Sequence, residues 1–140
     1  MAISTEDHVA ISRLMYRYAR CADARDYEGF ADVFCPDAQF DLRGELVSSL
    51  PDIQQMMHNL DTYSRTQHFV HNVLYDVEGE QAQGQTYCLA CHLQQTPGGA
   101  VKIDMGITYD DILRRTPDGW RIARRLFNLL WSSTGEVESH

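Results

Sequence analysis

Four long runs that read as β-strands fill the second half of the chain, and they leave few ways for it to fold. The runs cover residues 68–77, 81–95, 100–115 and 119–131. The connections between them read EGE, TPGG and TPDG, and each combines Gly with Pro, Asp or Glu as a turn does. Strands joined by such short connections pair with their neighbours in antiparallel order. The sequence therefore predicts an antiparallel meander after residue 65.

The first half of the chain carries helical signals instead. Ser4 and Asp7 form a helix-start pattern, and an apolar stripe at helical spacing then predicts a helix of about 18 residues. Asp26 is placed to cap a second, shorter helix over residues 27–34, just before Pro36. Residues 38–44 alternate like a short half-buried strand. Pro51 suits the first turn of a third helix, over residues 51–60.

This order of elements places the helices on one face of a curved antiparallel sheet, with a pocket between the two layers. The predicted fold class is α+β. No repeat or linker interrupts the 140 residues, so a single domain is expected over residues 1–134. The last six residues, 135–140, read GEVESH and are expected to form a loose tail.

The net charge of the chain argues against two classes of binding partner. A formal net charge of -8 repels phosphate backbones and anionic lipid surfaces, so nucleic acid and membranes are not expected as partners. No apolar run reaches the roughly 18 to 20 residues of a bilayer span, and the N-terminus is too polar for a secretion signal. A cytoplasmic location is the resulting expectation.

The motifs of several chemistries are missing. The chain has no dinucleotide-binding or phosphate-binding glycine loop, no Gly-x-Ser-x-Gly elbow and no His-Glu-x-x-His pair. Cys88, Cys91 and His92 have a spacing that could begin a zinc site, but they lie in a predicted strand without a second ligand pair. All four cysteines, which include Cys21 and Cys35, are therefore interpreted as buried thiols. Neither a metal nor a cofactor is expected.

Three histidines lie in predicted strands and are the candidates for proton transfer: His68, His71 and His92. His68 and His71 are three residues apart, so only one of them faces the pocket if the strand is regular. The polarity of the two alternating sets does not choose between them. His92 and Asp104 are a further possible polar pair, but nothing in the sequence selects them.

Three segments, residues 21–44, 65–92 and 109–131, together resemble the SnoaL-like branch of the nuclear transport factor 2-like superfamily. Its members include γ-hexachlorocyclohexane dehydrochlorinase, scytalone dehydratase and bile acid 7α-dehydratase. The resemblance implies a cone-shaped sheet of the cystatin-like α+β barrel type. It also implies a catalytic pair of an aspartate after the first helix and a histidine at the start of a long strand, which correspond here to Asp23 and His68.

The resemblance further implies a lyase that needs no cofactor, of the dehydratase or dehydrohalogenase type. The apolar residues expected to line the pocket indicate a hydrophobic small molecule as its substrate. An isomerase or cyclase and a non-catalytic binding or assembly module, such as a dioxygenase β-type subunit, remain as alternatives. Substrate contacts are expected from a set of weaker candidates: Tyr18, Tyr87, Leu89, Met105 and His71.

Two expectations concern the surface of the sheet. An arginine run in the last two strands alternates with apolar residues and acids, which is typical of a solvated or subunit-facing surface (Arg114, Arg115, Arg121, Arg124 and Arg125). The outer sheet face around Trp131 is expected to form a homodimer or homotrimer, because members of the superfamily commonly associate there.

Overall fold

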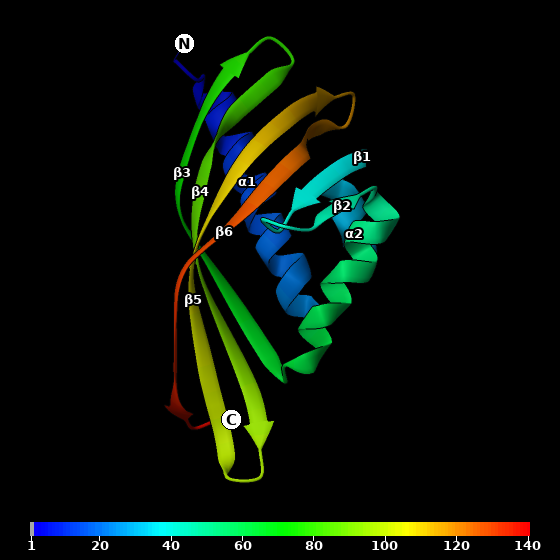
Figure 1. Ribbon diagram of the computed structural model, residues 1–140. Helices are drawn as coiled ribbons and strands as arrows, with labels where there is room; N and C mark the ends of the chain where they lie inside the picture. The colour runs from blue at the N-terminus through cyan, green and yellow to red at the C-terminus, as the bar shows by residue number, and fades with distance from the viewer. Residues whose placement is uncertain (1) are drawn as a thin grey trace.

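A computed structural model describes residues 2–140 and shows two helices packed on one side of a strongly twisted sheet (Figure 1). The elements follow one another along the chain as α1 (Thr5–Ala24), η1 (Glu28–Asp32), β1 (Phe34–Asp41), β2 (Leu46–Ser48), α2 (Leu50–Met57), η2 (His58–Thr62), β3 (Arg65–Glu78), β4 (Gln81–Thr96), β5 (Gly99–Thr116) and β6 (Gly119–Val137). The predicted α+β class is confirmed.

The sheet has the strand order β2-β1-β6-β5-β4-β3. Strands β3 to β6 form the predicted antiparallel meander, and β1 adds to its edge by pairing in parallel with β6. The register shifts between Val70 and Val73 in β3, and between Gly106 and Ile107 in β5. Such irregularities increase local twist and bend a sheet. The long strands consequently curve around the helices and enclose a space beneath them.

Helix α1 is positioned by its two ends. The Ser4 hydroxyl accepts a hydrogen bond from the Asp7 N–H at 3.0 Å, which caps the first turn. The helix ends at Arg25, whose φ of 57° is left-handed and turns the chain sharply toward η1. The buried face of α1 includes Ile11, Met15 and Tyr18, and it packs against the sheet. Asp23 is thereby held in the last turn of a helix anchored at both ends.

Several details differ from the sequence prediction. The strand expected over residues 38–44 is β1 at Phe34–Asp41, and the short strand β2 was not predicted. The segment expected as a helix over 27–34 is only the short 3₁₀ turn η1, whose N-cap residue is Tyr27 and not Asp26 as expected. The Asp26 carboxylate nevertheless accepts the Gly29 N–H at 3.0 Å. The turn stops early because Phe34 pairs with Ile122 and begins β1. The expected loose tail is shorter than predicted, because β6 continues to Val137 through pairing with Ala100.

Candidate acid-base site

Asp23 and His68 meet where the end of α1 approaches the start of β3. The Nδ1 atom of His68 lies 2.7 Å from Oδ1 of Asp23, which is a short, charge-assisted hydrogen-bond distance. The backbone N–H of His68 donates to the other carboxylate oxygen, Oδ2, at 2.9 Å. The Thr66 hydroxyl donates to Oδ1 at 3.0 Å. The carboxylate is therefore held by three donors from two residues of one strand.

These hydrogen bonds decide the charge of Asp23. Burial acts to raise the pKa of its carboxyl, but the donors from His68 and Thr66 outweigh it and hold the pKa below its usual value. Asp23 is then an ionised acceptor at neutral pH, so the hydrogen of the shared bond belongs to Nδ1 of His68. This tautomer leaves Nε2 as the nitrogen that can accept a proton from a ligand.

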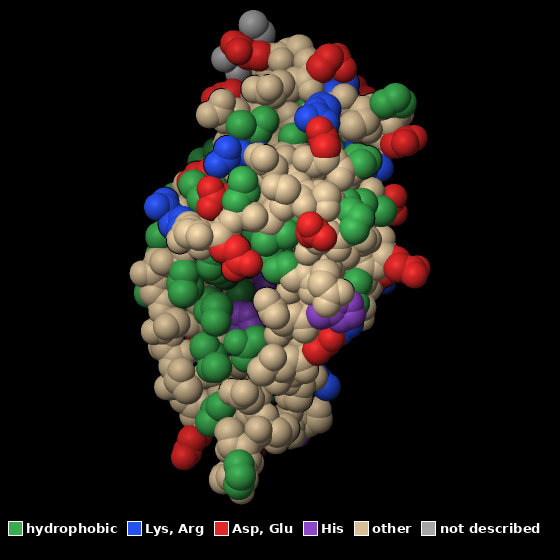
Figure 2. Space-filling view, turned by 45° about the vertical axis from the view of Figure 1, so that its right-hand side comes forward, with side chains coloured by type: hydrophobic (Ala, Val, Ile, Leu, Met, Phe, Trp, Pro, Cys, Tyr) green, Lys and Arg blue, Asp and Glu red, His purple; other side chains and the backbone are tan. Residues whose placement is uncertain are grey.

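A cavity of about 240 Å³ lies between the helices and the sheet, and His68 forms part of its wall. The His68 side chain is 7 % exposed. Most of the remaining lining is apolar or aromatic (Tyr18, Ala22, Phe40, Leu42, Met56, Met57, Asn59, Leu60, Tyr63, His92, Met105, Ile107, Tyr109 and Phe127). Figure 2 shows a histidine ring at the bottom of a hollow bordered by hydrophobic side chains. The site thus joins one polar ring to an apolar pocket.

Asp23 itself lines a separate surface groove, which Tyr16, Arg20 and Val70 also border and which His68 reaches from its other side. Its side chain is 27 % exposed. The histidine therefore separates its carboxylate partner from the cavity. A ligand in the cavity would meet the imidazole and not the carboxylate.

His92 is a second histidine of the cavity wall, with its ring centroid 5.9 Å from that of His68. Its Nδ1 lies 3.2 Å from the Ile103 carbonyl oxygen. Burial lowers the pKa of His92. The suggested pairing with Asp104 does not occur, because Asp104 forms an ion pair with Lys102 on the other face of the sheet, at 3.3 Å. His68 and His92 both lie on the inner face of the sheet, and the alternation of side chains along each strand explains why Asp104 lies on the outer face.

The five weaker candidates divide between the two faces of the sheet. Tyr18 and Met105 line the cavity with His68. His71, Tyr87 and Leu89 instead border a hollow on the outer face, beside Trp131. Strand geometry explains the difference, since His71 is three residues from His68, and Tyr87 and Leu89 alternate with the inward-facing Cys88 and Ala90. These three residues are thus placed away from the pocket in which substrate contacts were expected.

Several cavity residues were not singled out by the sequence, and three of them come from one segment. Asn59, Leu60 and Tyr63 belong to η2 and its end, which cover one side of the cavity. The apolar spacing of residues 53–60 was visible, but it indicated only a helix with a buried face. From sheet strands, Tyr109 and Phe127 were missed in the same way, as ordinary core aromatics.

One arginine departs from the predicted surface run. Arg125 is fully buried, and its Nε and Nη2 donate to Asp111 at 2.8 and 2.7 Å. Its guanidinium lies 4.3 Å from the ring centroid of Tyr18 and 3.9 Å from that of Tyr109. The other four arginines form ion pairs; the side chains of Arg114, Arg115 and Arg124 are 36 to 50 % exposed, as predicted, but that of Arg121 is only 13 % exposed.

Among residues 2–140, no group of three or more metal-binding side chains gathers. All four cysteines are buried and free. Within the same residues, no helix combines the length and hydropathy needed to cross a bilayer.

The family model of the SnoaL-like domain matches residues 4–126. The chain belongs to the SnoaL-like family. Curated relatives of this SnoaL-like chain include uncharacterized proteins of Mycobacterium tuberculosis (Rv2910c) and Mycobacterium bovis (Mb2934c). Each is 32% identical over 128 residues, which cover 86% of this chain and 83% of the relative.

Solved structures share the fold of the SnoaL-like chain. The Kfla4162 protein of Kribbella flavida has a TM-score of 0.85 at 20% identity and covers 91% of this chain and 93% of its own. A type 2 hexachlorocyclohexane dehydrochlorinase has a TM-score of 0.82 at 15% identity, with coverages of 94% and 91%. A protein of Novosphingobium aromaticivorans named after scytalone dehydratase has a TM-score of 0.81 at 19% identity, with coverages of 93% and 88%. Likenesses at these identities establish the cystatin-like, nuclear transport factor 2-like fold.

Proposed function

We propose that the protein is a lyase that removes a proton from a hydrophobic small molecule with His68, oriented by Asp23, and expels a leaving group from the neighbouring carbon. The observation that carries the proposal is the 2.7 Å contact between His68 Nδ1 and Asp23 at the wall of an apolar cavity. This arrangement supports the proposal, because proton abstraction requires a base, a carboxylate that orients it and a space for the reacting carbon.

The reaction follows from the tautomer. Nε2 of His68 takes a proton from a carbon next to an activating group, and the C–H electrons form a double bond as the adjacent bond to the leaving group breaks. The imidazolium is stabilised by the Asp23 carboxylate, which stays ionised. For a hydroxyl leaving group, the same proton passes from Nε2 of His68 to the departing oxygen and completes water; a halide leaves as the anion and the proton passes to solvent. Such proton transfer contributes about 10² to 10⁴-fold in rate.

The lining of the cavity supports a neutral, apolar substrate. Its lining includes five aromatic side chains and three methionines. No Lys or Arg of residues 2–140 belongs to this lining. The net charge of -8 also opposes the approach of anions. Methionine adapts to irregular shapes and aromatic rings supply large flat contacts, so a ring compound is the substrate class that the cavity favours.

The alternatives gain less support from the geometry. An isomerase with a carboxylate base would need an inward acid such as Asp104, but Asp104 lies on the outer face with Lys102. A binding module would not need Asp23 to point at His68, as it does. The expected self-association also stays a proposal; it is supported by exposed apolar residues on the outer face, among them Phe69, Leu130 and Trp131.

The test compares the purified protein with three variants on two probe compounds, hexachlorocyclohexane and scytalone. We expect product formation, and a loss of about 10² to 10⁴-fold in kcat/KM for His68→Gln and for Asp23→Asn. His71→Gln is the matched control, because it changes a histidine of the same strand that lies on the outer face. Equal losses in His71→Gln would contradict the assignment, and binding of the probes without turnover by wild type would favour the binding module.

A further inference from the structure

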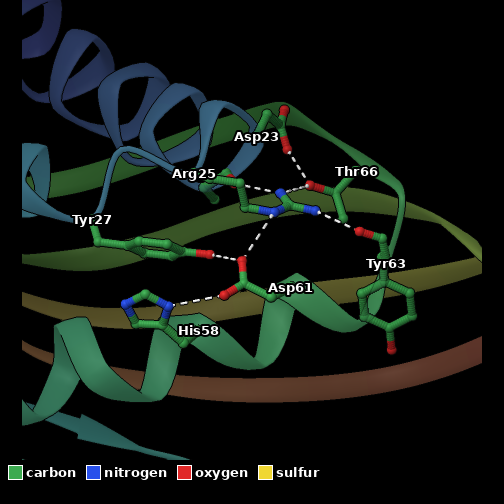
Figure 3. A network of polar contacts seen from close by, with 8 residues as sticks. Asp23, Arg25, Tyr27, His58, Asp61, Tyr63 and Thr66 are labelled. Carbon is green, nitrogen blue, oxygen red and sulfur yellow. Dashed lines mark hydrogen bonds and ion pairs between the residues drawn. The ribbon is translucent and has the colours of Figure 1, made fainter.

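Thr66 lies between Arg25 and Asp23, the carboxylate of the Asp23–His68 pair, which is called the dyad below (Figure 3). It lies two residues before His68 on β3, so both side chains extend from the same face of the strand. The residue is 2 % exposed. Its hydroxyl oxygen lies 3.0 Å from Oδ1 of Asp23 and 2.8 Å from Nη1 of Arg25.

The direction of the two hydrogen bonds is fixed by chemistry. A guanidinium has only donors, so the Thr66 oxygen accepts from Arg25. An ionised carboxylate has only acceptors, so the Thr66 hydroxyl hydrogen points to Asp23. The Thr66 hydroxyl thus bridges the Arg25 guanidinium and the Asp23 carboxylate by accepting one hydrogen bond and donating another. Oδ1 of Asp23 receives both this hydrogen and the Nδ1 hydrogen of His68.

Arg25 is itself held from several sides. Arg25 is the C-cap residue of α1 and has a left-handed backbone conformation. Its Nη1 also donates to the Ala22 carbonyl at 2.7 Å. Its Nη2 donates to the Tyr63 carbonyl at 3.4 Å, and its Nε lies 3.8 Å from Asp61. Both Tyr63 and Asp61 belong to the segment that covers the cavity. Arg25 therefore joins that segment to the end of the helix that carries Asp23.

Asp61 is fixed in turn by two further residues. Tyr27 donates its hydroxyl hydrogen to Oδ1 of Asp61, and His58 Nδ1 lies 2.9 Å from Oδ2. The ring centroids of Tyr27 and His58 are 3.8 Å apart. This cluster keeps the carboxylate of Asp61 beside Arg25, as the dashed contacts of Figure 3 show.

We propose that Thr66 and Arg25 are positioning residues of the acid-base pair: Thr66 locks the Asp23 carboxylate plane toward His68, and Arg25 aims the Thr66 hydroxyl. This inference rests on the proposed function of the dyad. The terminal torsion of an aspartate is broad and soft, so a carboxylate needs a lateral donor to keep one oxygen on the imidazole. The backbone N–H of His68 holds Oδ2, and Thr66 is the side chain outside the dyad that donates to Oδ1.

The experiment compares Thr66→Val, which keeps the side-chain shape and removes the hydroxyl, with Thr66→Ser, which keeps the hydroxyl. On the probe compound that wild type turns over, we expect kcat to fall about 10-fold in Thr66→Val with KM within about 2-fold. Thr66→Ser should restore kcat to within about 2-fold of wild type. Arg25→Gln should give a smaller fall than Thr66→Val, because Thr66 keeps its donor to Asp23.

A second measurement does not depend on turnover. The pKa of Asp23, followed by carboxyl-carbon NMR, should rise in Thr66→Val and stay in place in Thr66→Ser, because the hydroxyl stabilises the ionised form. If Thr66→Val leaves both kcat and this pKa unchanged while His68→Gln abolishes turnover, the positioning role is wrong and the dyad stands. If His68→Gln is as active as wild type, the proposed function fails. The pKa of Asp23 measured by NMR then remains as the test of whether Thr66 holds the Asp23 carboxylate.

Discussion

Two pairs of an acid and a basic side chain lie near Tyr18, and they have almost the same contact distance but opposite surroundings. His68 and Asp23 meet at 2.7 Å, and so do Arg125 and Asp111. The first pair lies between a cavity and a surface groove, with the side chain of Asp23 27 % exposed. The second pair is closed off, with exposures of 1 % for Arg125 and 0 % for Asp111.

The difference separates a pair that can exchange a proton from a pair that cannot. An imidazole changes its charge in the pH range in which proteins work, whereas a guanidinium stays protonated. Asp111 and Arg125 face each other across β5 and β6, and the Tyr75 hydroxyl donates to Asp111 at 2.6 Å. The Asp111–Arg125 pair therefore packs its guanidinium against the rings of Tyr18 and Tyr109 and has a structural role. In the dyad, by contrast, Nε2 of His68 is the nitrogen left free for a ligand in the cavity.

The largest expected effect on stability comes from breaking the buried pair. Asp111→Asn leaves the guanidinium of Arg125 as an uncompensated buried charge, which costs about 3 to 5 kcal/mol. Asp23→Asn should cost less, because it leaves a neutral imidazole and not a fixed charge beside the new amide, and because the Asp23 side chain is 27 % exposed. Urea unfolding of both variants measures the difference. Similar losses of unfolding free energy in the two variants would show that burial of the charged partner does not set the cost.

Replacing both members of the buried pair gives an intermediate outcome. Asp111→Leu combined with Arg125→Met removes both charges and fills the space with apolar atoms. Such replacements are often neutral or stabilising, so the double variant should recover most of the loss and return to within about 1 kcal/mol of wild type. The same unfolding assay checks this result. A double variant as unstable as Asp111→Asn would mean that the ion pair contributes more than the avoidance of a lone charge.

The smallest expected effect is a pH dependence that arises in the cavity. Burial lowers the pKa of His92 in the folded state, so the unfolded chain binds the proton more readily below the ordinary value of about 6.5. The stabilisation is present above that pH and is lost as the pH falls through the folded pKa. Wild type should therefore lose more stability than His92→Gln between about pH 8 and about pH 5.5. Parallel losses would contradict the buried neutral state of His92.

The sequence predicted the sheet well, because alternation and Gly-containing turns are local signals. It predicted the position of Asp23 and His68 only through the family resemblance, since the alternation of β3 left His68 and His71 equivalent. Arg125 could not be separated from its surface neighbours, because its partner Asp111 is set by the register of β5 and β6. The length of η1 was also wrong, because the pairing of Phe34 with Ile122 is a distant contact that overrides local helical spacing.

The state of the two His68 nitrogens is the most direct test of the acid-base assignment. Side-chain ¹⁵N NMR of the full chain shows which nitrogen of the neutral ring carries the hydrogen. The 2.7 Å contact predicts that this hydrogen is on Nδ1, that Nε2 has a free lone pair, and that Asp23→Asn removes this preference. A neutral His68 with its hydrogen on Nε2 would contradict the account, because the nitrogen facing the cavity would then have no lone pair to act as a base.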